Sequence, residues 1–249
     1  MSGKLYIQKI QERIEQIEKN AWPQIQTAAE MVADVIEKDG LIHAFGSGHT
    51  HILVEEIWCR AGGLAPINPL LDPNQMPYTG PFKGSALERL EGYGKILFET
   101  HDADPGDVMI VLSNSGRNPT PIEIALAAKE RGLKVIGITS MDYSRQVPSR
   151  HSSGKKLYEI VDLVIDNMGP LGDALVEIEN SSIKVGPSTT VLNALILNAI
   201  VCEAADILLK RGVEPPIFVS ANLDIPMEHN QRLFKQFKPR VRFFDRYPD

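Results

Sequence analysis

The sequence predicts an α/β fold, a doubly wound parallel sheet flanked by helices in a three-layer α/β/α sandwich. Two observations carry this prediction. Short runs that are apolar throughout, such as 108–112 (VMIVL), lead directly into segments with helical periodicity. Strands without polar alternation are typical of a parallel sheet that is covered on both faces. The chain has 249 residues, of which 43% are hydrophobic and 23% charged, so it can bury a core and wholesale disorder is excluded.

The helices and strands follow from local patterns. Isoleucines three or four residues apart over 7–17, and a second apolar stripe over 28–36, predict two helices separated by Pro23 and closed by Gly40. Strands are expected at 41–45, 108–112, 134–139 and 161–165. Further helices are expected at 50–60, 119–131 and 85–97, after residue 188, and at 228–237.

Three segments interrupt the alternation of strands and helices. Residues 66–84 are rich in proline and glycine, 141–156 are polar, and 212–227 lead into the tail. We expect long loops there, and loops of this length in compact proteins are often functional. We interpret residues 1–249 as one domain with an N-terminal helical extension (about 1–39) and a C-terminal tail (about 212–249).

Composition and charge limit the binding partners and the cellular location that we expect for this chain. The net charge is −6 and no basic block occurs, which argues against nucleic acid. The absence of an 18-residue apolar run and the charged N-terminal stretch argue against a membrane span and a secretory signal. The isolated Cys59 and Cys202 indicate a cytoplasmic protein without a disulfide framework. We expect no cofactor and no metal, because no His/Cys/Asp cluster has ligand spacing.

The strongest functional signal is a pair of strand–loop–helix junctions, 46–50 (GSGHT) and 113–118 (SNSGRN). Glycine lets a backbone approach a ligand closely, and hydroxyls and helix N-termini supply donors for phosphate oxygens. A P-loop would need Gly-Lys-Ser/Thr, and a dinucleotide fingerprint would need a third glycine where His51 stands. The pair therefore predicts a phosphate cradle without a lysine, the alternative being two ordinary tight turns.

Residues 107–140 (DVMIVLSNSGRNPTPIEIALAAKERGLKVIGITS) resemble the sugar isomerase (SIS) domain, whose hallmark is a strand, Ser-x-Ser-Gly, a helix and a second strand ending near threonine. Residues 41–63 resemble its first phosphate loop. The resemblance implies a phosphorylated sugar as partner and a homodimer or homotetramer with sites at the subunit interface. The phosphate-binding residues it implies are Gly46, Ser47, Gly48, Thr50, Ser113, Asn114, Ser115, Gly116, Arg117 and Asn118.

Two sugar-phosphate chemistries fit this resemblance. Phosphoheptose isomerases usually carry Ser or Thr where Asn118 stands, whereas 115–117 (SGR) and 186–195 (GPSTTVLNAL) look more like N-acetylmuramic acid 6-phosphate etherases. The latter turn would bring Ser188 and Thr189 to a third helix N-terminus facing the ligand, unless it simply caps a core helix. We interpret the chain as a phosphosugar isomerase of the phosphoheptose type. An etherase and a non-catalytic phosphosugar sensor are the alternatives, although no basic recognition helix precedes the domain.

Isomerisation needs a group that moves a proton between neighbouring carbons, and elimination needs a base and an acid. Burying a carboxylate within the apolar stretch 52–58 costs free energy unless the group is catalytic or paired with a cation. A second group of acids, in 85–97, follows the long loop. Histidines beside the first loop and in the tail add further candidates. The tail could close over the sugar of the same or of the neighbouring subunit. The candidate catalytic residues are Glu55, Glu56, His49, Glu88, Glu91 and His229. By contrast, we expect His43 to be a core residue and His101 to lie in a turn before a strand.

Overall fold

The computed structural model describes residues 2–223 and 227–244. Five parallel strands form one sheet in the order β2-β1-β3-β4-β5. They are β1 (Ile42–Gly46), β2 (Ile67–Pro69), β3 (Val108–Leu112), β4 (Lys134–Thr139) and β5 (Leu163–Asp166). Gly46 pairs with Leu112, which pairs with Ile138, so these three strands end side by side. The predicted strands are confirmed, and β2 is added within a segment expected to be a loop.

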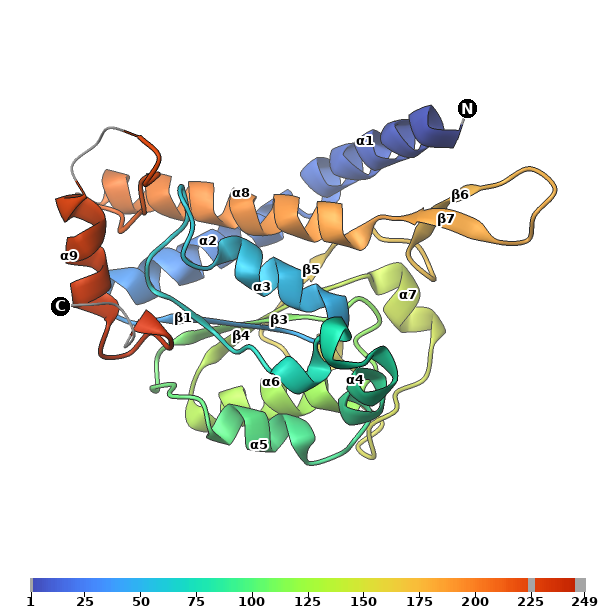
Figure 1. The fold of residues 1–249 in the computed structure, drawn as a ribbon, viewed down its shortest axis with the longest axis horizontal. Coiled ribbons are helices and arrows are strands. Elements are labelled where there is room, and N and C mark those ends of the chain that lie inside the picture. The colour runs from blue at the N-terminus through green and yellow to red at the C-terminus, as the bar shows by residue number, and fades with distance from the viewer. Residues whose placement is uncertain (1, 224–226, 245–249) are drawn as a thin grey trace.

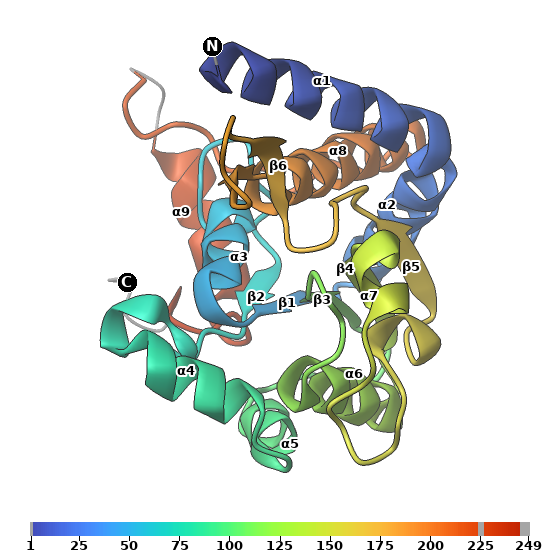
Figure 2. The same cartoon turned by 90° about the vertical axis from the view of Figure 1, so that its right-hand side faces the viewer.

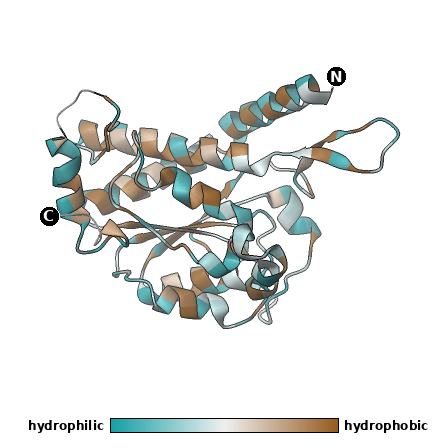
Figure 3. Ribbon diagram, in the orientation of Figure 1, coloured by the Kyte–Doolittle hydropathy of each residue, from teal (hydrophilic) through white to brown (hydrophobic). Residues whose placement is uncertain are grey.

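Helices cover both faces of the sheet, which confirms the doubly wound fold (Figure 1). One face carries α2 (Trp22–Glu37), α3 (His51–Ile57) and α8 (Thr189–Lys210), and the other carries α5 (Tyr93–Glu99) and α6 (Pro119–Arg131). Alternate strand residues feed two separate cores: Ile42 and Ala44 pack in the first, Phe45 and Met109 in the second. Figure 3 shows hydrophobic residues along the strands and along α8.

Helix α8 is, by length and composition, the one described helix that could cross a membrane. Its apolar residues Leu192, Ile196 and Ile200 are instead buried against the core that includes α2. The apolarity of α8 is therefore explained by its place in the protein interior.

The structure corrects several expected boundaries. The helix expected over 85–97 is two helices, α4 (Pro81–Glu88) and α5, separated at Gly92, which has a φ of 89°. The helix expected over 50–60 begins as a 3-10 turn and ends at Ile57, and Cys59 then has a positive φ of 48°. Because a left-handed residue cannot continue a right-handed helix, the chain turns there.

The remaining elements lie around this core. Helix α1 (Ser2–Asn20) confirms the first predicted helix, and α9 (Glu228–Phe237) confirms the tail helix. Helix α7 (Met141–Gln146) begins the segment expected to be a polar loop. An unexpected antiparallel hairpin, β6 (Ala174–Glu177) and β7 (Lys184–Pro187), precedes α8. Figure 2 looks onto the carboxyl end of the sheet and shows α3, α4, α6 and α7 around it.

Candidate functional site

The first glycine-rich loop leaves β1 in a conformation that only glycine fits. A Cβ on Gly46 would lie 2.7 Å from Thr50 Cγ2 and 2.9 Å from the Thr50 carbonyl oxygen, and Gly48 has a φ of 58°. Ser47 is nearly buried, and its Oγ donates a hydrogen bond of 2.6 Å to Glu88 Oε1 on α4. The fold thus places a carboxylate, 41 residues away in sequence, directly on the predicted phosphate loop.

The second loop leaves β3 beside the first and is fixed to β4. The carbonyl of Asn114 accepts hydrogen bonds from Thr139 Oγ1 (3.1 Å) and from the Ser140 N–H (3.0 Å). Gly116 has a φ of 58°, and a Cβ there would approach Thr139 Oγ1 to 3.2 Å. Within the described residues, the hydroxyls of Ser113 and Ser115 make no hydrogen bond, which leaves their donors available to a ligand.

The helix that follows offers fewer backbone donors than the sequence motif suggests. Helix α6 begins at Pro119, and Pro121 follows within its first turn, so two of the terminal N–H groups are missing. Asn118 stands at the N-cap without a side-chain capping bond, and its Oδ1 accepts from Arg150 Nη1 at 3.0 Å. The donors at this site therefore come mainly from side chains and from the loop itself.

Three arginines gather at the second loop. Burial lowers the pKa of Arg150, and the positive charges of Arg117 and Arg89 lower it further, while Glu88 raises it. The Nε of Arg117 is buried without a hydrogen-bond partner among the described residues. Mutually repelling guanidinium groups with an unused donor favour an anion between them. Arg89 and Arg150 were not predicted; the long polar segment 141–156 was the only signal for Arg150.

Ser188 and Thr189 are held by a carboxylate of the protein itself. The carboxylate of Asp173 accepts from the N–H groups of Ser188 (2.9 Å) and Thr189 (2.8 Å) and from both hydroxyls. This carboxylate already occupies the positive end of α8. The structure therefore gives these two residues a capping arrangement rather than donors open to a ligand.

The acids on α3 face away from the core. Leu53, Val54 and Ile57 are buried, whereas Glu55 is exposed and Glu56 is paired with Arg60. The expectation of a buried carboxylate was wrong for Glu55, because the helical period turns it to the solvent side. Glu56 is half-buried and takes the paired arrangement that the sequence left open.

The other candidates separate into two groups. His49 and Glu91 lie near the carboxyl end but are exposed. Hydrogen bonding from the side chain of Ser152, and from its N–H at 2.6 Å, lowers the pKa of Glu91. His229, 2.8 Å from the Ile217 carbonyl, lies on α9, which packs over Leu41 before β1. Helix α9 therefore covers the opposite end of the sheet, so the tail does not close over the two loops of its own chain (Figure 1).

His51 is buried under the first loop and contacts its backbone. It is 2% exposed, its Nδ1 lies 2.8 Å from the Gly48 carbonyl, and its Nε2 accepts from the Asp72 N–H at 3.3 Å. Burial lowers its pKa, so the imidazole is neutral at pH 7 with its proton on Nδ1. Among the described residues, no group of three His, Cys, Asp or Glu side chains is arranged to hold a metal.

Comparison with known proteins identifies the family of this chain. A family model described as the SIS domain matches residues 5–140. The chain belongs to the SIS domain family. It is 44% identical over 236 residues to UPF0309 protein GK1441 of Geobacillus kaustophilus, which covers 95% of this SIS chain and 94% of that protein. A UPF0309 protein of Caldanaerobacter subterraneus, TTE0306, is 42% identical over 241 residues, 96% of this chain and 98% of the other.

Two solved structures share the fold of this SIS chain. Phosphoheptose isomerase GmhA from Neisseria gonorrhoeae superposes with a TM-score of 0.53 at 19% identity, covering 82% of this chain and 95% of that one. A phosphoheptose isomerase from Francisella tularensis gives the same TM-score at 15% identity, covering 82% and 96%. At this identity the likeness establishes the three-layer fold, and the chemistry has to be argued from the residues.

Proposed function

We propose that this SIS chain binds a phosphorylated sugar at the carboxyl end of its sheet and interconverts the aldose and ketose forms. One observation carries the proposal: a carboxylate, Glu88, is hydrogen-bonded to Ser47 of a phosphate-type loop, next to a second such loop and three arginines. Loops at the carboxyl ends of parallel strands are where ligands bind in this class of fold. The two phosphoheptose isomerases compared above share that fold, which supports the proposal.

The phosphate group is assigned to the second loop. Ser113 and Ser115 hold hydroxyls without partners in the described part of the chain, and Arg117 holds a buried donor in the same condition. A dianionic phosphate satisfies all of these groups and relieves the repulsion among the arginines. Thr50 and the backbone of 46–48 complete the cradle from the first loop.

Glu88 is assigned as the acid–base group. In aldose–ketose isomerisation a base removes the proton on C2 while the C1 carbonyl oxygen gains a proton from solvent, which gives an enediol. The protonated base then returns its proton to C1 while the C2 hydroxyl gives up its proton to solvent and becomes the carbonyl. The carboxylate of Glu88 is half-buried on α4 and stands beside the loop that would hold one end of the sugar. Ser47 orients it, because a hydroxyl at 2.6 Å fixes one carboxylate oxygen and leaves the other for the substrate.

The test is proton exchange at C2 and C1 followed by proton NMR in D₂O with a panel of aldose and ketose phosphates. Glu88→Gln keeps the shape of the side chain and should lower the exchange rate by about 10² to 10⁴, with little change in affinity. Glu99→Gln is the matched control, because Glu99 is exposed and pairs with Lys95 on α5. Equal exchange rates for the two variants would remove Glu88 from the mechanism.

Binding has a separate test. Calorimetry with the best phosphosugar should show no heat for the double variant Ser113→Ala/Ser115→Ala, while its thermal unfolding stays close to wild type. Retained affinity would place the phosphate elsewhere. A chain that binds but shows no exchange in any variant would instead act as a phosphosugar sensor.

The etherase alternative loses one of its supports. It rested partly on the hydroxyl turn before α8, where the Asp173 carboxylate stands. Because that carboxylate already accepts from the hydroxyls and the N–H groups of Ser188 and Thr189, these donors are not open to a substrate, and we favour the isomerase. Release of a hydroxy acid from an ether-linked sugar phosphate would reverse this preference.

We further propose a homodimer whose interface adjoins the site. Large apolar side chains are exposed on elements that flank the carboxyl end: Ile7 on α1, Ile52 on α3, Ile183 and Val185 on the hairpin, and Val191 on α8. A second copy covering these groups would remove apolar surface from water and bring new residues to the loops.

A further inference from the structure

A buried chain of three polar residues lies at the amino end of the sheet, opposite the two phosphate-type loops. Asp107 immediately precedes β3, His43 lies in β1, and His101 lies between α5 and β3. The Oδ2 of Asp107 is 3.0 Å from His43 Nε2, and His43 Nδ1 is 2.8 Å from His101 Nε2. His43 and His101 are 0% and 2% exposed.

The hydrogen bonds assign the protons in this chain of residues. A carboxylate only accepts, so His43 carries its proton on Nε2 and accepts at Nδ1. His101 must then donate from Nε2, which leaves Nδ1 with a lone pair. The amide of Asn68, 3.4 Å from His43 Nδ1, is also oriented to donate and agrees with this assignment.

The lone pair of His101 meets no donor from the described part of the chain. Its Nδ1 is buried without a hydrogen-bond partner among the described residues. Burial lowers the pKa of His101 to about 3, and His43 and Arg242 lower it further, so the imidazole does not take up a proton at pH 7. A buried acceptor left empty costs free energy, which indicates that a donor other than the described residues belongs there.

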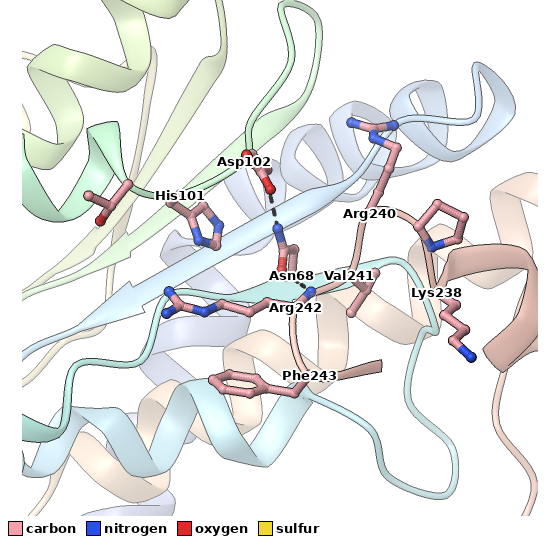
Figure 4. Close-up of a pocket in the computed structure, with 10 residues that line it drawn as sticks. Asn68, His101, Asp102, Lys238, Arg240, Val241, Arg242 and Phe243 are labelled. Atoms are coloured by element: carbon pink, nitrogen blue, oxygen red, sulfur yellow. Dashed lines mark hydrogen bonds between the residues drawn. The ribbon is translucent and has the colours of Figure 1, made fainter. Parts of the chain in front are cut away.

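A pocket of about 300 Å³ opens beside this imidazole (Figure 4). It is bordered by His101, Asn68 and Asp102 on one side and by 238–243 of the tail on the other. Arg240 is neutralised, since it pairs with Asp104 and Asp107. Arg242 makes no ion pair with any described residue; its guanidinium lies 5.4 Å from the centre of the Phe243 ring, and its charge is felt at His101.

We propose that this pocket is a second ligand site, which takes a small anion carrying a hydroxyl group. The hydroxyl donates to His101 Nδ1 and the anionic group pairs with Arg242. The ligand satisfies the buried acceptor together with a guanidinium that pairs with no described residue, which neither a simple anion nor a neutral alcohol does.

The residues favour binding over catalysis. A nitrogen with a pKa near 3 is a weak base, so His101 accepts a hydrogen bond without removing the proton. The Asp107–His43 pair acts as a positioning device, because it holds Nε2 of His101 and leaves Nδ1 as the nitrogen without a partner among the described residues. The site stands at the end of the sheet opposite Ser113 and Ser115 and does not depend on the proposed isomerase chemistry.

The test uses matched ligand pairs in calorimetry with the full chain carrying Ser113→Ala and Ser115→Ala, so that the carboxyl-end loops take no phosphate. Glycerol 3-phosphate is compared with 1-propyl phosphate, and glycerate with propionate; each pair differs in hydroxyl groups. We expect the hydroxylated member of at least one pair to bind about tenfold more tightly than its partner, and glycerol alone not to bind. The two pairs distinguish a phosphate from a carboxylate ligand.

A surface substitution keeps the proposal falsifiable without touching the buried residues. Arg242→Gln should weaken binding by about tenfold or more. Arg232→Gln is the control and should leave binding unchanged, because Arg232 is an exposed arginine on α9 that pairs with Glu214. The imidazole ¹⁵N resonance of His101 Nδ1, identified by its loss in His101→Gln, should shift on titration with the hydroxylated ligand only. Equal binding of both members of each pair, no binding of any, or equal affinity in Arg242→Gln and Arg232→Gln would overturn the proposal.

Discussion

Mild acid should destabilise the fold through His101, because the folded protein holds this imidazole neutral. Burial lowers its pKa to about 3, from the 6.5 of an ordinary histidine, with further lowering by His43 and Arg242 and an opposing effect of Asp107. The unfolded chain therefore binds one more proton than the folded protein between these two pH values. The stability is complete above pH 6.5 and decreases as the pH falls through this window.

The size of the effect follows from the two pKa values. Each pKa unit corresponds to about 1.4 kcal/mol, so the whole gap is worth about 5 kcal/mol, reached only near pH 3. At pH 5.0, where most carboxylates are still ionised, the loss of stability through His101 should be about 2 kcal/mol. That is a large fraction of the stability of an ordinary domain.

Urea unfolding at pH 7.0 and pH 5.0 measures this loss in the wild type and in His101→Gln. Glutamine offers an amide N–H to His43 but has no proton to gain. The wild type should therefore lose about 2 kcal/mol more than the variant over this interval. His51, whose pKa burial also lowers, is present in both chains and cancels in the difference. Parallel losses in the two chains would refute the assignment of a buried neutral His101.

Three further outcomes are expected. Gly116→Ala should abolish phosphosugar binding in calorimetry and lower the free energy of unfolding by about 1–3 kcal/mol, because it strains a φ of 58° and crowds Thr139. The control Gly154→Ala, at a φ of 70° in open space, should lower the free energy of unfolding less and leave binding intact. Asp173→Ala should lower the free energy of unfolding in urea by about 2–3 kcal/mol, since it strips the acceptors from the start of α8, and an unchanged value would show that this helix end is satisfied otherwise. Ile52→Glu should convert the proposed dimer to a monomer in light scattering, whereas the similarly exposed Ile96→Glu on α5 should not.

Local patterns predicted most of the elements. Residues 108–112 and 134–139 form strands as expected, and 119–131 form α6, because each pattern is decided by neighbours within a few residues. Strand β2 and the β6–β7 hairpin were missed. β2 is only 67–69 and owes its existence to pairing with β1, which no local pattern records.

The charged residues were harder to place than the glycines. Glu55 and Glu88 had similar standing in the sequence, yet one faces solvent and the other bonds to Ser47. The difference comes from the break between α4 and α5 at Gly92 and from the way α4 packs on the loops. Arg150 reaches Asn118 across 32 residues of sequence, a contact that depends on the path of the chain after β4.

The sequence by itself determined the sheet, its covering helices and the two glycine–hydroxyl loops, because backbone conformation and burial at those positions depend on residues close in the chain. Only the tertiary structure decided which charged groups meet. The register of β1 against β3 brings His43 to Asp107, 64 residues apart, and the tail brings Arg242 to the same pocket. Such contacts rest on long-range packing, in which a shift of one strand position would turn each side chain to the opposite face of the sheet.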